Sequence, residues 1–88
     1  AETGASGIWA GFNVHLAADM LLEAAALTTQ INGQVIPSNV PGNVAMAVRQ
    51  PAGVVLGIAP WNAPVILGVR AIATPLACGN TVVLKGSE

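Results

Sequence analysis

Residues 54–84, VVLGIAPWNAPVILGVRAIATPLACGNTVVL, form the stretch that decides the fold. The runs 54–58 and 81–84 are short and continuously apolar, which is typical of strands buried on both faces of a parallel sheet. Between them, residues 65–76 have helical length and are apolar nearly all round, so we expect a buried helix that is closed by Gly79. Strand, helix and strand in this order form a right-handed βαβ unit. The sequence therefore predicts an α/β fold.

The segments before this unit predict a long helix and a separate strand. Residues 5–30 read as one helix because apolar side chains recur every four residues, at Ile8, Phe12, Leu16 and Met20. Asn32-Gly33 is a strong turn signal, and residues 43–49 alternate apolar and small side chains as an edge or bridging strand does. The chain then divides into a helix and loop, a bridging strand and the start of the βαβ unit, at residues 1–42, 43–53 and 54–88.

Charge is scarce along the whole chain. Only 8% of the residues are charged and 53% are hydrophobic, whereas ordinary soluble domains are about 25% charged. A small free-standing domain needs more charge than this to coat its surface. We therefore expect the 88 residues to be an internal fragment of a larger protein and to be poorly soluble alone.

The same composition argues against several other classes of protein. The most apolar stretch, residues 65–84, is interrupted by Arg70 and Pro75, which disfavours a membrane span. A net charge of −1 offers no electrostatic footprint for nucleic acid, and a single Cys cannot form an internal disulfide. We expect a cytoplasmic protein that binds neither membrane nor nucleic acid.

Two groups of reactive residues have ordinary structural interpretations. His15, Asp19 and Glu23 lie one helical turn apart and could converge on a metal, but a solvated helix face is much more common, so we expect no metal. Cys78 lies in an apolar run with no His, Lys or carboxylate near it in sequence to activate its thiol, as inert buried cysteines do.

The loop after the first buried strand is the most distinctive polar feature. Ligands of open parallel sheets bind beyond the carboxyl ends of the strands. Asn62 lies there between Pro60 and Pro64, so its amide could donate to a developing oxyanion at little entropic cost. Judged from the residues alone, a cap for the loop or for the next helix is the simpler role.

The motifs GIAPWNAP at 57–64 and PLACGNTVVLKGSE at 75–88 closely resemble the aldehyde dehydrogenase superfamily. Most of the chain shares the resemblance, since 2–4 (ETG), 33–37 (GQVIP) and 49–54 (RQPAGV) are also similar to family segments. IWAGFNVH at 8–15 and the loop near Pro41 are most similar to bacterial salicylaldehyde and related aromatic-aldehyde dehydrogenases. The resemblance implies a partial Rossmann-like NAD-binding domain that follows an oligomerisation-type strand.

The resemblance also implies roles for individual residues. Asn62 matches the amide that stabilises the oxyanion formed when a Cys attacks the aldehyde, and Lys85 and Glu88 match the pair that holds the adenosine ribose. The cofactor cleft is expected to be lined also by Ala59, Pro60 and Trp61. Because a Glu accepts from a ribose 2′-OH and repels a 2′-phosphate, we expect NAD rather than NADP.

Two further residues are candidates for the substrate tunnel. Arg70 stands where other branches of the family often have an aromatic residue, and it could pair with a polar ring substituent. A buried Arg paired with a carboxylate elsewhere is an equal alternative. Trp9 is a second candidate, although packing against the βαβ unit is the favoured role for its ring.

Taken together, these features lead to one hypothesis and one alternative. The first is a part of an NAD-dependent, homo-oligomeric aldehyde dehydrogenase that oxidises an aromatic, salicylaldehyde-like aldehyde to its carboxylic acid. The family's catalytic Cys and general-base Glu lie in motifs that these 88 residues lack, so the isolated chain is expected to be inactive. The alternative is a non-catalytic module that uses its apolar surface for assembly.

Overall fold

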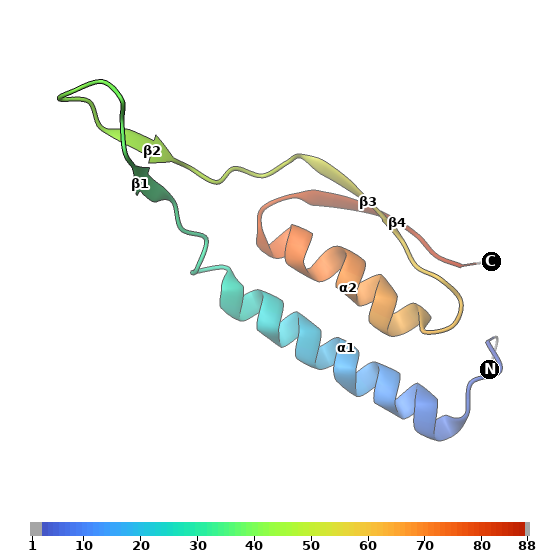
Figure 1. The fold of residues 1–88 in the computed structure, drawn as a ribbon. Coiled ribbons are helices and arrows are strands. Elements are labelled where there is room, and N and C mark those ends of the chain that lie inside the picture. The colour runs from blue at the N-terminus through green and yellow to red at the C-terminus, as the bar shows by residue number, and fades with distance from the viewer. Residues whose placement is uncertain (1–2, 88) are drawn as a thin grey trace.

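The computed structural model describes residues 3–87 and confirms the predicted βαβ unit (Figure 1). Strand β3 (Val54–Ile58) leads into helix α2 (Pro64–Ala77), which returns to strand β4 (Thr81–Lys85). The two strands pair in parallel, with Val54 opposite Thr81 and Ile58 opposite Lys85. The carboxyl ends of both strands therefore lie at one edge of the sheet.

Helix α2 begins at a proline, whose φ is fixed by its ring, and is followed by a glycine in a conformation that other residues rarely adopt. Pro64 occupies the first turn, where its missing N–H removes no helical hydrogen bond. Gly79 follows the helix with φ of 81°, the left-handed conformation that favours glycine. Its N–H donates to the Leu76 carbonyl, and the Asn80 N–H donates to the Pro75 carbonyl, each at 3.0 Å. These bonds form a Schellman cap, which confirms the predicted role of Gly79.

Helix α1 (Gly7–Leu27) is slightly shorter than the predicted span 5–30. It begins after Ser6, whose Oγ accepts a hydrogen bond from the Trp9 N–H at 3.2 Å. Its buried residues are Asn13, Ala17 and Ala24. Small side chains at two of these three positions let α1 approach α2 closely. Within the apolar row that predicted the helix, Ile8 and Phe12 are 89% and 51% exposed, whereas Met20 is half-buried and lines a pocket between the two helices.

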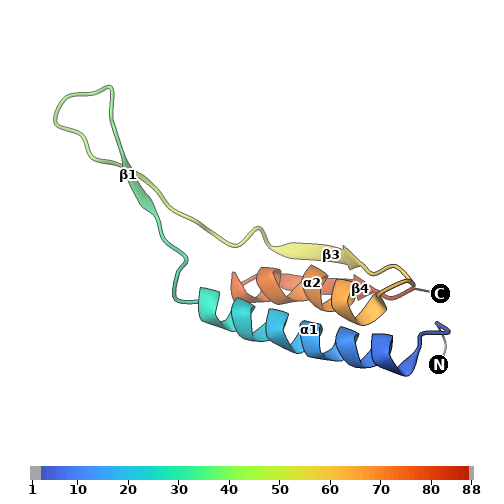
Figure 2. The same ribbon diagram turned by 60° about the horizontal axis from the view of Figure 1, so that its bottom comes forward.

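The elements are arranged in layers, with α2 between the two-stranded parallel sheet and α1 (Figures 1 and 2). Only one face of the sheet is covered. Val54, Leu56 and Ile58 alternate onto the other face and are 64–74% exposed. Residues 3–87 supply only one covering helix, so the second face of the predicted buried strands and much of α2 are uncovered in this fragment. Gly57 faces α2 instead and is buried.

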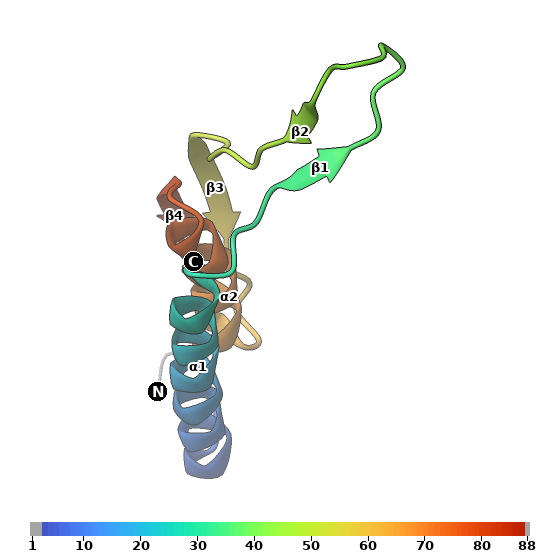
Figure 3. The same ribbon diagram turned by 90° about the vertical axis from the view of Figure 1, so that its left-hand side faces the viewer.

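A hairpin projects away from these layers (Figure 3). Strand β1 (Gln34–Ile36) pairs antiparallel with β2 (Ala45–Ala47). The strand predicted at 43–49 is therefore confirmed over its central residues, whereas Asn32-Gly33 is not the hairpin turn. Gly33 instead lies against β2, where an added Cβ would fall 2.7 Å from the Ala47 carbonyl oxygen.

The chain is elongated rather than compact, which agrees with the expectation, drawn from its shortage of charge, that it is a fragment. The radius of gyration is 18.2 Å, whereas a compact domain of this length would have about 12 Å. Among the helices of residues 3–87, none combines the length and the apolar character needed to cross a membrane.

Candidate functional site

The carboxyl edge of the parallel sheet brings together residues that the sequence places 26 positions apart. The Ala59 N–H donates to the Lys85 carbonyl at 3.0 Å, so the two strands remain paired one residue beyond the end of β3. Ala59 is buried, while Pro60 and Trp61 are exposed beside it. The Lys85 side chain is also exposed, and its Nζ donates to the Gly86 carbonyl at 3.2 Å.

These are four of the five residues predicted to hold a nucleotide cofactor. The fifth, Glu88, lies outside the described residues. The edge offers an ammonium group, backbone groups and an exposed indole ring around a buried alanine, and these can contact the ribose and adenine parts of a dinucleotide.

Asn62 lies between this edge and the start of α2. Its side chain is exposed, and no side-chain hydrogen bond caps α2 at Ala63. The Asn62 side chain therefore does not cap α2, which was the simpler role considered for it. The backbone carbonyl of Asn62 accepts a hydrogen bond from the Trp9 indole Nε1–H at 3.4 Å. Residues 53 positions apart thus meet at this loop.

Trp9 and Asn62 line one pocket of about 180 Å³ between the first turns of α1 and α2. The other residues around it are mainly apolar or small: Thr3, Ala5, Ala10, Asn13, Val14, Pro64 and Val65. The pocket joins an amide to an indole ring and to aliphatic walls. Such a combination can hold an apolar molecule that has one polar oxygen.

Asn13 is a pocket residue that the sequence reasoning missed. It is 4% exposed, and its Nδ2 donates to the Trp9 carbonyl at 2.9 Å. Its Oδ1 is buried and accepts no hydrogen bond from any residue in 3–87. The available signal was a polar side chain one turn after Trp9, between the apolar residues Phe12 and Val14.

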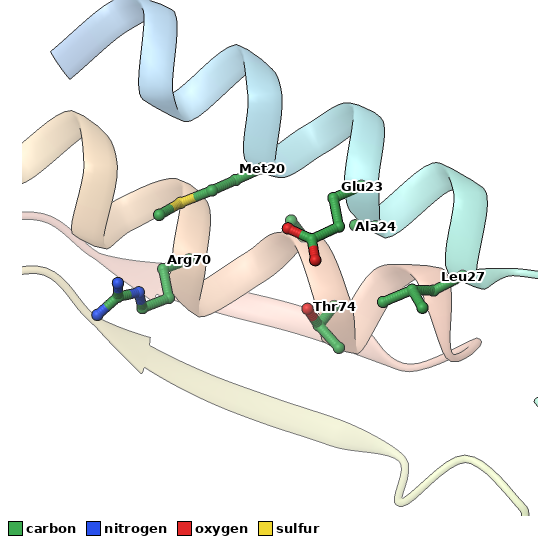
Figure 4. A pocket seen from close by; sticks show the side chains of 7 residues that line it. Met20, Glu23, Ala24, Leu27, Arg70 and Thr74 are labelled. Atoms are coloured by element: carbon green, nitrogen blue, oxygen red, sulfur yellow. The ribbon is translucent and has the colours of Figure 1, made fainter. Parts of the chain in front are cut away.

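Arg70 does not line this pocket. It contributes to a second one, of about 280 Å³ between α1 and α2, together with Met20, Glu23, Ala24, Leu27, Ala73 and Thr74 (Figure 4). Figure 4 shows the Arg70 guanidinium turned away from Glu23. The Arg70 side chain is exposed and forms no ion pair within the described part of the chain. The structure brings Trp9 to Asn62 but leaves Arg70 in a separate pocket.

The other two reactive groups lie away from this site. Cys78 follows the last residue of α2, so the helix separates it from Asn62 by roughly 20 Å. His15 and Asp19 are exposed on α1. Residues 3–87 contain no group of three or more such side chains that could hold a metal ion.

Comparison with known proteins places this arrangement in a family. The profile described as "Aldehyde dehydrogenase family" matches residues 1–88. A vanillin dehydrogenase of Pseudomonas sp. (strain HR199) is 83% identical over 87 residues, which are 99% of this chain and 18% of that protein. The chain thus spans about a fifth of the length of such relatives.

Solved structures agree with the sequence comparison. The crystal structure of a salicylaldehyde dehydrogenase from Pseudomonas putida G7, complexed with salicylaldehyde, has a TM-score of 0.90 and 56% identity. The match covers 97% of this chain and 18% of that one. An NAD-dependent benzaldehyde dehydrogenase from Corynebacterium glutamicum has a TM-score of 0.92 and 37% identity, over 99% and 19% of the chains. The fold is that of a partial Rossmann-like NAD-binding domain, and the chain belongs to the aldehyde dehydrogenase family.

Proposed function

We propose that this chain supplies the oxyanion donor and part of the cofactor cleft of an NAD-dependent dehydrogenase of hydroxylated aromatic aldehydes. The observation that carries the proposal is the position of Asn62. Asn62 is exposed after β3, lines the pocket with Trp9, and lies three residues after Ala59, which pairs with Lys85. An aldehyde at the amide would therefore lie next to a cofactor at the edge of the sheet.

The contribution of Asn62 to the reaction is electrostatic. When a thiolate adds to the aldehyde carbon, a C–S bond forms and the π electron pair moves onto the oxygen. An amide N–H of Asn62 donates to that oxyanion, which carries more charge than the aldehyde oxygen and is therefore stabilised more. The attacking Cys and the base that later activates water belong to the remainder of the enzyme.

The cofactor part of the proposal rests on the sheet edge. Lys85 and Glu88 would hold the adenosine ribose, with Ala59, Pro60 and Trp61 lining the cleft. NAD, when bound, supplies the hydride acceptor. A Glu88 carboxylate would accept from the 2′-OH of NAD and repel the 2′-phosphate of NADP, so NAD is the proposed cofactor.

The substrate class follows from the relatives. Vanillin and salicylaldehyde, which name two of them, are benzaldehydes with a ring hydroxyl group. In this chain Trp9 is a proposed wall of the aldehyde tunnel, since its ring lines the pocket with Asn62. Arg70, the other candidate for the tunnel, lines the separate pocket between α1 and α2, so no contact with a ring in the Trp9–Asn62 pocket is assigned to it.

Two further proposals concern the whole enzyme. The β1–β2 hairpin projects from the layers and resembles an inter-subunit segment, so we assign it to a contact in a homo-oligomer. A cytoplasmic location is also proposed for the enzyme, where Cys78 would stay a reduced thiol.

The substitution Asn62→Ala tests the function in a full-length enzyme that carries this segment. We expect the rate of the first NADH burst to fall about 10²–10³-fold, as for other oxyanion donors, with NAD binding unchanged. Asn32→Ala, the same change at an exposed residue between α1 and β1, is the matched control and should leave the burst intact. An undiminished burst in Asn62→Ala would exclude the proposed role.

A further inference from the structure

The amino-terminal turn of α1 holds the loop that carries Asn62. The Trp9 indole N–H donates to the Asn62 carbonyl at 3.4 Å, and this is the only hydrogen bond that Asn62 makes within residues 3–87. Neither Pro60 nor Trp61 makes a hydrogen bond there. Among residues 3–87, Trp9 is thus the only hydrogen-bond partner of loop residues 60–62.

Trp9 is itself held in three ways. Its backbone N–H donates to the capping Ser6 Oγ at 3.2 Å, and its carbonyl accepts from Asn13 Nδ2 at 2.9 Å. Its ring stacks on Phe12, with 5.4 Å between ring centroids and 23° between the ring planes. The indole nitrogen therefore reaches the loop from a position that the helix has already defined.

The orientation of the Asn62 peptide decides where its side chain points. Rotation of that peptide moves the Cα–Cβ bond, and an amide displaced by about 1 Å loses much of its effect on a transition state. An oxyanion donor on a loop therefore needs a second group that fixes the backbone. The indole N–H is placed to be that group.

We propose that Trp9 is a positioning residue for Asn62, and that its indole N–H aims the Asn62 amide at the aldehyde oxygen. This inference rests on the proposed role of Asn62 and adds a second role for Trp9. A tunnel wall acts on substrate affinity and on the choice among rings. A positioning residue instead acts on the chemical step, whatever the ring.

The test uses the full-length enzyme and replaces Trp9 with benzothienylalanine, in which sulfur takes the place of the indole N–H and the ring keeps its shape. Trp9→Phe serves as the genetically encoded companion. We expect the NADH burst to slow about fivefold to tenfold, as for loss of one neutral hydrogen bond. In the benzothienyl variant, which keeps the ring shape, the burst should slow by the same factor for benzaldehyde and for vanillin. The KM for the aldehyde should change by less than about twofold.

A double-mutant cycle with Asn62→Ala separates the inference from the function on which it rests. If Trp9 acts through Asn62, its replacement in the Asn62→Ala background slows the burst no further. An equal slowing in both backgrounds, or a change in KM for vanillin alone, would overturn the positioning role. A normal burst in Asn62→Ala would instead refute the proposed function.

Phe12→Leu is the control for the ring contact, because it removes the stacking partner and keeps the indole N–H. We expect its burst rate to stay within about twofold of the parent enzyme. A loss as large as that of the benzothienyl variant would assign the effect to packing and would contradict the inference.

Discussion

Gly57 of β3 lies directly against Ala71 of α2: an added Cβ would fall 2.9 Å from the Ala71 Cβ and 3.2 Å from Leu84 Cδ1. The first contact is closer than real Cβ atoms come, and the second requires the end of the Leu84 side chain to shift, so Gly57→Ala should push α2 away from the sheet. We expect the free energy of unfolding to fall by about 1–3 kcal/mol. Chemical denaturation of the full-length enzyme measures this change.

Gly11→Ala is the matched control for Gly57. Gly11 lies inside α1, and an added Cβ there has no neighbour within 4 Å among the described residues. Alanine favours helix over glycine by up to about 1 kcal/mol, so this change should be neutral or stabilising. Equal losses at both positions would contradict the assigned contact.

Gly79→Ala should destabilise the end of α2. The φ of 81° disfavours any residue with a Cβ, and the new atom would lie 3.1 Å from Pro51 Cγ. The expected loss is about 1–2 kcal/mol, whereas Gly79→Asn should cost less because Asn tolerates this conformation. Comparing the melting temperatures of the two variants checks the order, and a smaller loss for Ala would refute it.

Asn13→Leu tests the buried Oδ1 that has no partner in residues 3–87. Leucine has the same branched shape with bulkier methyl groups, for which the adjoining pocket has room, and it leaves no buried polar atom, so stability should be unchanged or higher. Asn13→Asp buries a charge at the same place and should lower the free energy of unfolding by more than about 2 kcal/mol. A large loss for the leucine variant would mean that another part of the enzyme donates to Oδ1.

Lys85→Met tests the proposed contact with the cofactor ribose. Losing a charged hydrogen bond should raise the KM for NAD about tenfold or more, while kcat at saturating NAD changes little. Arg49→Met removes an exposed cation whose Nε donates to the Asn32 carbonyl in the region of the hairpin. Its KM for NAD should be unchanged, and a similar rise there would point to a general charge effect.

The isolated 88 residues should neither oxidise aldehydes nor remain monodisperse. The chain lacks the catalytic Cys motif of the family, and Leu56 is 66% exposed on an uncovered sheet face. Exposed apolar faces of this kind associate, so Leu56→Lys should reduce aggregation measured by light scattering. Aldehyde-dependent NADH formation by the purified 88 residues would refute the first expectation, and a cooperatively melting monomer the second.

Residues close in sequence account for the parts of the fold that were predicted correctly. The apolar runs around residues 54–58 and 81–84, with Gly79 between them, specify a βαβ unit because turn geometry and local hydrophobic pattern act over a few residues. The same reasoning placed a strand at 43–49 but not its partner at Gln34–Ile36. Alternation marks a strand without naming the strand that pairs with it.

The candidate site divides in the same way. The motif around Asn62 and its placement with Lys85 at one edge of the sheet followed from short motifs and from the parallel direction of two strands. The hydrogen bond from Trp9 to Asn62 and the buried Oδ1 of Asn13 did not. Both depend on the position of α1 along the axis of α2, and no local sequence pattern encodes that position.

The sequence by itself determined the α/β class, the family and the residue that is proposed as oxyanion donor, because each depends on residue types at short, fixed spacings. Only the tertiary structure showed that Trp9 contacts the Asn62 loop and which faces remain uncovered. The contact depends on side-chain packing between α1 and α2 across 53 positions of chain. Such packing is set by shape and close contact in three dimensions, which the order of residues along the chain does not reveal.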